Sequence, residues 1–252
     1  MKYSIGIDSG STTTKGVLYD GVEIVKQVMI PTTAKPRMSI QEVYRELYTE
    51  GVKMTVTTGY GRKLLSEADR SFTEITCHGA GAGWLKPGIG GVIDIGGQDC
   101  KAILLNSTGQ VVDFMMNDKC AAGTGRFVEV MMRILEQPIE ALDSFVEGRE
   151  IIPINSMCTV FAESEIISLL AEEKDPGGIA LGVLHSICKR TAFFAQKLPM
   201  KGEIFFTGGL TRSKAFCEIL SRYMGKTLIT HEDAPLAGAI GAAILGYARI
   251  RD

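Results

Sequence analysis

Apolar and polar residues alternate in the first part of the chain in the way that β-strands require. Three segments with strand composition open the sequence, at residues 3–10, 14–21 and 22–30. The Asp20-Gly21 pair between the second and third segments is typical of a hairpin turn. A further strand is expected over residues 53–62, ending in a turn that contains Gly59 and Gly61.

The strand-and-loop pattern of the N-terminus recurs about 86 residues later. Residues 4–20 and 91–106 both run from an apolar strand through an aspartate, a glycine-containing turn and a lysine into a second apolar strand. The aspartates are Asp8 and Asp94, and the lysines are Lys15 and Lys101. A repeat of this length indicates two domains of related design, because solenoid repeats are shorter.

Helical spacing of apolar residues appears once in the first half and dominates the second half. Helices are expected at residues 39–50, 125–136, 139–146, 160–172 and about 179–198. Residues 203–213 read as a buried strand, a Gly-Gly turn and a helix start, and residues 227–248 read as a strand, a turn and a helix. That last helix is rich in alanine and glycine, so it can approach another surface closely.

Composition changes this picture little, because the 252 residues are 45% hydrophobic and carry a net charge of −2. This balance shows no bias towards nucleic acid or anionic membranes. No run of about 18 apolar residues suggests a membrane span. The N-terminus leads almost directly into the first strand without a signal peptide, so a cytoplasmic protein is expected.

Six cysteines occur without any Cys-x-x-Cys pair, which argues against a zinc site or a thioredoxin-like centre within one chain. Disulfides are not expected in a cytoplasmic protein. Free cysteine is often a small core residue. That interpretation is kept for four of the six, which are Cys77, Cys100, Cys188 and Cys217.

The two aspartate-containing loops have the chemistry of a phosphate site, although neither matches the P-loop or the Gly-x-Gly-x-x-Gly pattern. Glycines let backbone amides approach phosphate oxygens, and hydroxyls and a lysine add donors. The candidate residues are Gly10, Ser11, Thr12, Thr13 and Lys15 in the first loop, and Gly96, Gly97, Gln98 and Asp99 in the second. Asp8 and Asp94 suit Mg²⁺ held through water, and Gln98 suits the orientation of an attacking water. Taken singly, each loop is also compatible with an ordinary hairpin turn.

With the later segment "TGGLTRS", residues 207–213, these loops resemble the motifs of the actin, Hsp70 and sugar-kinase ATPase superfamily. The resemblance implies an α/β fold of two ribonuclease-H-like domains with ATP in the cleft between them. It places Gly208, Gly209 and Leu210 at the adenosine. The first domain would span residues 1–90 plus 236–252, with the last helix packing back on it, and the second would span residues 91–235.

Two cysteine segments are similar to those of one branch of that superfamily. "NDKCAAGTGRF" (117–127) and "SMCTVFAESEI" (156–166) resemble the ATP-dependent activators of 2-hydroxyacyl-CoA dehydratases. The benzoyl-CoA reductase ATPases of the BadF/BadG/BcrA/BcrD type and the double-cubane cluster protein reductases share this design. The resemblance implies one [4Fe–4S] cluster on the axis of a homodimer, held by Cys120 and Cys158 of each chain. It also adds Gly123 and Thr124 to the nucleotide site.

The resemblance implies an oxygen-sensitive, ATP-driven donor of one low-potential electron. Ferredoxin or flavodoxin would reduce it, and a dehydratase-type or double-cubane iron–sulfur protein would accept the electron. Two alternatives stay open at this point. One is a small-molecule kinase of the same fold, in which Asp99 could serve as the base, and the other is a nucleotide-sensing regulator without redox chemistry. Neither nucleic acid nor a membrane is an expected partner.

Overall fold

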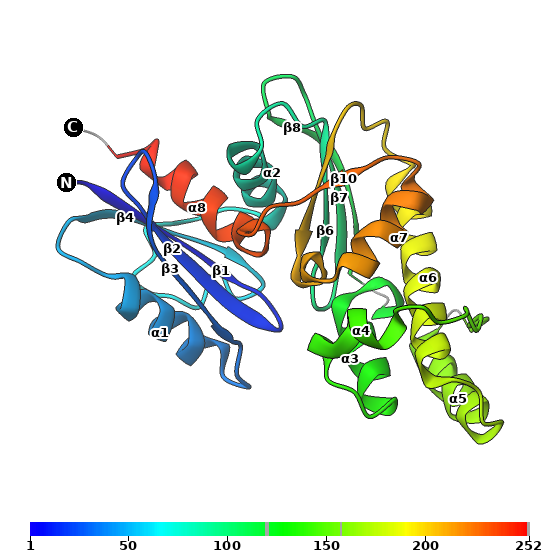
Figure 1. Cartoon of the computed structure of the whole chain (residues 1–252). Coiled ribbons are helices and arrows are strands. Elements are labelled where there is room, and N and C mark those ends of the chain that lie inside the picture. Colours follow the sequence, from blue (N-terminus) through cyan, green and yellow to red (C-terminus); the bar gives the residue numbers. More distant parts are fainter. Residues whose placement is uncertain (119–120, 157, 251–252) are drawn as a thin grey trace.

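Two five-stranded mixed sheets lie side by side in the computed structural model, which describes residues 1–118, 121–156 and 158–250 (Figure 1). The first sheet has the order β3-β2-β1-β4-β5 and the second β10-β9-β6-β7-β8. The strands of the first are β1 (Tyr3–Ser9), β2 (Thr13–Tyr19), β3 (Ile24–Pro31), β4 (Val52–Gly59) and β5 (Arg70–Ser71). Those of the second are β6 (Gly91–Ile95), β7 (Cys100–Leu105), β8 (Val111–Asn117), β9 (Ile204–Gly208) and β10 (Leu228–Ile229).

The two sheets have the same topology, which explains the internal repeat. In each, three consecutive strands are antiparallel, and a fourth strand pairs in parallel with the first of them. A fifth, short strand then continues in parallel at the edge. This duplicated α/β arrangement confirms the fold class expected from the sequence. The boundaries at residues 90/91 and 235/236 stay a prediction.

Eight α-helices cover these sheets in the described part of the chain. They are α1 (Pro36–Leu47), α2 (Glu74–Leu85), α3 (Gly125–Ile134), α4 (Leu142–Val146), α5 (Thr159–Ala171), α6 (Pro176–Ala195), α7 (Lys214–Met224) and α8 (Ala237–Tyr247). None of the helices described is both long and apolar enough to cross a membrane.

Alternating side chains give the first sheet two apolar faces. Ile5 and Ile7 of β1 pack with Val43 of α1 on one face. On the other face, Val17 of β2 packs with Ala239 of α8. The last helix therefore returns to the first strands, as the resemblance to the ATPase superfamily implies (Figure 1).

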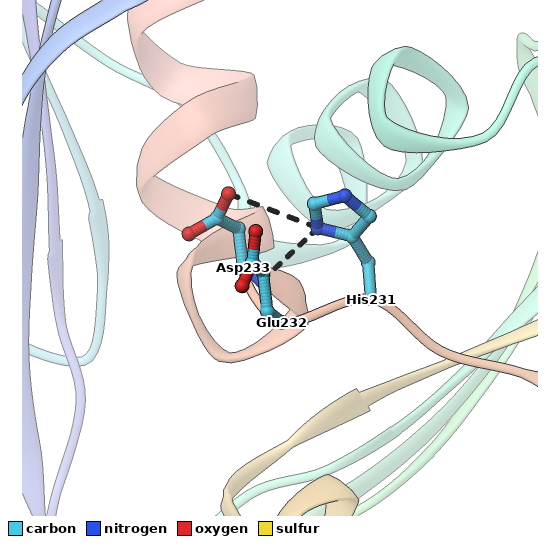
Figure 2. Close-up of side chains that lie close together, drawn as sticks. All are labelled: His231, Glu232 and Asp233. Carbon is cyan, nitrogen blue, oxygen red and sulfur yellow. Dashed lines mark hydrogen bonds and ion pairs between the residues drawn. The ribbon is translucent and has the colours of Figure 1, made fainter.

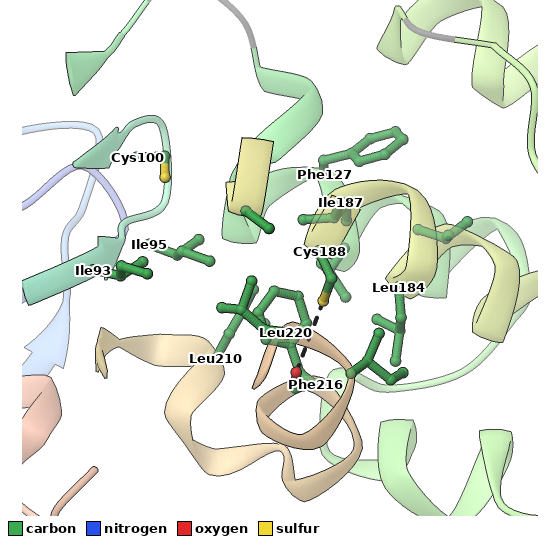
Figure 3. Close-up of a cluster of buried hydrophobic side chains, with 14 of the residues drawn as sticks. Ile93, Ile95, Cys100, Phe127, Leu184, Ile187, Cys188, Leu210, Phe216 and Leu220 are labelled. Carbon is green, nitrogen blue, oxygen red and sulfur yellow. Dashed lines mark hydrogen bonds between the residues drawn. The ribbon is translucent and has the colours of Figure 1, made fainter. Parts of the chain in front are cut away.

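The second sheet is also covered on both faces. On one side, Ile93 and Ile95 pack into the largest apolar cluster, where α3, α6 and α7 meet; Figure 3 shows Phe127, Cys188 and Phe216 of these helices. The thiol of Cys188 lies 3.8 Å from the carbonyl oxygen of Phe216. On the other side, strand residues pack against α2.

Helices α2 and α8 pack backbone against backbone between the two sheets. A Cβ atom at Gly81 would overlap the carbonyl oxygen of Ala237, and one at Gly241 would overlap the carbonyl oxygen of Cys77. Only glycine permits this approach at both positions. The small residues expected to let the last helix come close to another surface do so here.

Several elements differ from the sequence expectation. Helix α1 begins at Pro36, because proline is well suited to the first turn, and ends at Leu47, because Tyr48 is extended. Three elements were not predicted, namely helix α2, the short strand β5 and strand β8. Helix α2 has small apolar residues on several faces instead of one stripe, so helical spacing does not reveal it.

Candidate nucleotide site

A cleft with a volume of about 680 Å³ is lined by residues of both sheets. Its walls include the two loops that join β1 to β2 and β6 to β7, together with the Gly-Gly segment after β9. Of the predicted site residues, the lining includes Asp8, Gly10, Ser11, Thr12, Thr13, Lys15, Asp94, Gly96, Gly97, Gln98, Asp99, Gly208, Gly209 and Leu210. Three segments that are distant in sequence thus form one cavity.

The predicted residues Gly123 and Thr124 do not line this cleft. Thr124 is fully buried, and its hydroxyl donates a hydrogen bond to the carbonyl of Ala121. Gly123 lines a separate cavity of about 80 Å³. Next to them, the amide of Gly125 donates to the carbonyl oxygen of Gly96 at 2.9 Å. This segment supports the second loop from behind.

Asp8 and Asp94 lie at the floor of the cleft, one from each sheet, with His78 of α2 between them. The Nε2 atom of His78 is 3.9 Å from Asp8 Oδ2, and its Nδ1 atom is 3.6 Å from Asp94 Oδ1. All three side chains are buried. The hydroxyl of Thr207, in the third motif, is 3.3 Å from Asp94 Oδ1. The floor therefore joins all three motifs.

The two lysines of the repeat occupy equivalent registers but have different surroundings. Lys15 lies opposite Asp8 in the β1–β2 ladder, and its Nζ is 4.0 Å from Asp8 Oδ2. Lys101 lies opposite Asp94 in the β6–β7 ladder. Its Nζ is 3.0 Å from Asp94 Oδ2, and it also binds carboxylates of two other residues, Asp99 at 2.6 Å and Glu74 at 3.0 Å.

These contacts decide the charges at the cleft floor. Burial opposes ionisation of Asp94, but the electrostatic interactions of its carboxylate with His78 and Lys101 outweigh burial and hold the pKa of Asp94 well below its ordinary value. Burial also opposes the charge of Lys101, but Asp94, Asp99 and Glu74 raise the pKa of Lys101 well above its ordinary value. Asp94 and Lys101 are therefore both ionised at neutral pH.

The two loops meet across the cleft. A Cβ atom at Gly97 would overlap the hydroxyl of Thr12 and lie 3.0 Å from that of Ser11. Gly208, at the end of β9, has a φ of 105°, and a Cβ there would overlap the carbonyl of Ile95. Glycine at position 97 lets the second loop come close to side chains of the first, and glycine at position 208 lets β9 end close to the backbone of β6.

Among the described cysteines, Cys158 differs from the others because it is exposed. It is the N-cap residue of α5, and its side chain makes no capping hydrogen bond. Burial raises the pKa of the Cys77 and Cys100 thiols to about 12 and that of Cys217 to about 11. The core role expected for these thiols agrees with this burial. Cys120 lies outside the described residues.

A small group of possible metal ligands, His231, Glu232 and Asp233, lies on the turn before α8 (Figure 2). The amide of Asp233 donates to His231 Nδ1 at 3.1 Å, and Asp233 Oδ2 is 3.7 Å from the same atom. His231 and Glu232 are exposed. These two contacts stay within one turn, so they account for its conformation without a ligand.

Sequence reasoning missed three residues of the site. His78 and Glu74 are not among the predicted site residues, and Lys101 was predicted only as the lysine of the second repeat, without its three acidic partners. Glu74 and His78 are four positions apart on α2, the spacing that puts two side chains on one face of a helix. Recognising α2 would have shown that both point to the same side.

Comparison with known proteins agrees with this geometry. The YjiL protein of Escherichia coli (strain K12) is 49% identical over the whole chain and 99% of its own length. The (R)-2-hydroxyglutaryl-CoA dehydratase activating ATPase of Acidaminococcus fermentans is 39% identical, covering 97% of both chains. A solved structure of the activator of 2-hydroxyisocaproyl-CoA dehydratase from Clostridium difficile, with bound ADPNP, matches with a TM-score of 0.91 and 36% identity over 98% of this chain and 94% of that one.

A more distant likeness shows the fold alone. A ROK family glucokinase from Streptomyces griseus, solved with glucose and AMPPNP, has a TM-score of 0.60 and 13% identity, over 98% of this chain and 99% of its own.

The family model for the BadF/BadG/BcrA/BcrD ATPases matches residues 5–246. The cleft, the duplicated sheets and this match agree, and the chain belongs to the BadF/BadG/BcrA/BcrD ATPase family.

Proposed function

We propose that this chain is an ATP-driven donor of one low-potential electron, which it passes to an iron–sulfur partner such as a 2-hydroxyacyl-CoA dehydratase or a double-cubane cluster protein. Relatives at 37–39% identity are named as activators of such dehydratases. The observation that carries the proposal is the exposed thiol of Cys158 at the start of α5 in a chain that also has a nucleotide cleft.

The cleft fits a nucleotide with Mg²⁺. Two buried carboxylates, Asp8 and Asp94, face it from different sheets and suit a hydrated cation. Lys15 and the loop amides would hold phosphate oxygens, and the exposed side chain of Gln98 at the rim would orient the attacking water. A nucleotide held by residues of both sheets would favour one relative orientation of the sheets over another, because it binds the two orientations with different affinity.

The residues also fit a [4Fe–4S] cluster. Iron–sulfur clusters of this type require four thiolates, and a homodimer doubles the two that one chain would offer through Cys120 and Cys158. Cys158 is the N-cap residue of α5, so it lies at the positive end of the helix dipole, where a thiolate is favoured. When bound, the cluster would supply the electron, with ferredoxin or flavodoxin as its reductant. The chain's own part is to hold it and to alter its surroundings with the nucleotide state.

The kinase alternative loses its candidate base in this structure. The carboxylate of Asp99 lies 2.6 Å from the buried ammonium of Lys101, so it is engaged in an ion pair. The likeness to glucokinase supports the fold and not a sugar-binding activity.

Iron analysis of protein purified without oxygen tests the proposal. We expect about four irons per dimer and a brown colour that dithionite bleaches. Cys158→Ala should lose most of the iron while its affinity for a non-hydrolysable ATP analogue stays within about threefold, since Cys158 is not in the cleft lining.

The matched control is Cys217→Ala, because Cys217 is a half-buried thiol on α7 in the same half of the molecule. It should retain the iron of the wild type. A colourless, iron-free wild-type protein that phosphorylates a metabolite would contradict electron donation.

A further inference from the structure

Arg190, on α6, hydrogen-bonds to two segments that are far apart in the sequence. Its Nη2 donates to the carbonyl oxygen of Ser156 at 2.9 Å, and its Nη1 donates to that of Ala122 at 3.4 Å. Ala122 comes two positions after Cys120, and Ser156 comes two positions before Cys158. One guanidinium therefore connects the neighbourhoods of both proposed ligands.

The planar fork of arginine suits this role. Its donors point in fixed directions and can reach two acceptors at once, whereas lysine has a single compact ammonium. Arg190 is partly buried and borders the cavity of about 80 Å³ that Gly123 also lines.

Ser156 is held from its other side by α5. The amide of Ser156 donates to Glu165 Oε2 at 2.8 Å, and the amide of Asn155 donates to Glu165 Oε1 at 2.9 Å. The two residues Asn155 and Ser156, which precede Cys158 in the chain, are thus held between Glu165 and Arg190.

The segment around Ala122 is in turn attached to the nucleotide loop. The amides of Gly125 and Arg126, at the start of α3, donate to the carbonyls of Gly96 and Gly97 at 2.9 and 3.1 Å. Ala122 and the start of α3 belong to one short stretch of chain. Hydrogen bonds attach this stretch to the second loop on one side and, through Arg190, to Ser156 on the other.

We infer that Arg190 is a positioning residue that joins the segment after Cys120 to the segment before Cys158, so that both follow the second nucleotide loop as one unit. Arg190 lies outside the nucleotide cleft lining. This role rests on the proposed function, and it specifies how a nucleotide state would reach the surroundings of Cys158.

Hydrogen exchange followed by mass spectrometry on the full chain tests the inference, with and without Mg²⁺ and a non-hydrolysable ATP analogue. In the wild type, the analogue should slow exchange in residues 121–127 and in residues 152–156 and 158–162. In Arg190→Gln, the response in the second region should fall at least threefold, while the response at 121–127 and the analogue's affinity stay within about threefold.

Arg190→Lys tests the two guanidinium hydrogen bonds separately from the positive charge, since lysine keeps the charge but cannot reach both carbonyls. Its exchange response in the second region should also fall at least threefold. If Arg190→Gln does not fold, the exchange response of Arg190→Lys is the test. Lys189→Gln removes the charge of the exposed neighbour on the same helix and should behave like the wild type. A wild-type response in either Arg190 variant overturns the inference.

Iron release into a chelator gives a second readout. Both Arg190 variants should lose iron at least tenfold faster than the wild type and Lys189→Gln; unchanged release would count against the positioning role. If the wild type itself binds no iron, the proposed function fails, but the exchange experiment on iron-free protein still decides whether Arg190 links the two segments.

Discussion

The two aspartate–lysine hairpins share a register, but their lysines have different environments. Among the described residues, Lys15 has one carboxylate partner, at 4.0 Å, and its side chain is 14% exposed. Lys101 has three carboxylates within 3.0 Å, and its side chain is 2% exposed. The same design thus places the ammonium of Lys15 in the cleft lining with one loose ion pair, and it holds that of Lys101 in three close ion pairs within the protein. The two hairpins share the register of aspartate and lysine. Helix α2 makes the difference, because it adds the carboxylate of Glu74 to the partners of Lys101.

Replacing the locked lysine should have the largest effect. Lys101→Met leaves Asp94, Asp99 and Glu74 without their shared cation, and Asp94 is buried. Removing one partner from such a buried set costs about 3–5 kcal/mol of unfolding free energy. Urea unfolding would measure this cost. A loss below about 1 kcal/mol would show that the two lysines do not differ as their surroundings indicate.

Acid denaturation of Asp94→Asn should give the next largest effect. The folded pKa of Asp94 is lowered, so its stabilising contribution is present above the ordinary value of about 3.9 and is lost as pH falls below that value towards the folded pKa. The variant should be about 1–3 kcal/mol less stable at pH 7, since a charged hydrogen-bonding partner is removed. The two stability curves should converge below about pH 4. Curves that stay parallel would mean that Asp94 is not held ionised by His78 and Lys101.

Lys15→Met should affect the ligand more than the fold. We expect the affinity for a non-hydrolysable ATP analogue to fall about tenfold, or about 1.4 kcal/mol, with the free energy of unfolding changed by less than about 0.5 kcal/mol. Calorimetric titration and urea unfolding give the two quantities. Equal losses in both would erase the distinction between the two lysines.

The smallest effect concerns the thiol behind the second hairpin. Cys100 begins β7 and faces the large apolar cluster, and burial raises its pKa to about 12. At pH 8 it should resist iodoacetamide, while the exposed Cys158 of metal-free protein is alkylated. Peptide mass spectrometry would compare the two. Equal alkylation of Cys100 and Cys158 would show that the apolar cluster does not shield the Cys100 thiol from the reagent.

The hairpins themselves could be predicted because their signals are local: an apolar strand, an aspartate, glycines and a returning strand lie within about twenty residues. The ion pairs of Lys101 with its three carboxylates could not be predicted in full. Glu74 belongs to helix α2, which has no single apolar stripe and therefore was not recognised. His78 was missed for the same reason. Strand β8 was missed because its exposed Val112, Phe114 and Met116 do not have the polar character of an outer face.

Other parts of the site depended on resemblance and not on physical pattern. The cluster residues Cys120 and Cys158 were singled out by their motifs, and their ligand roles stay predictions. Gly123 and Thr124 were assigned to the nucleotide, whereas the structure places them behind the second loop. A sequence motif marks a segment, but the side of the loop that faces the ligand is decided by packing.

The return of α8 to β1 has a consequence for synthesis on the ribosome. Strand β1 emerges long before the helix that covers one of its faces, Ala237–Tyr247, because more than 200 residues separate the two elements. The second sheet can be paired once residues 91–229 are available. One apolar face of the first sheet stays exposed until α8 has been synthesised. We expect chaperones to bind the nascent chain during that interval.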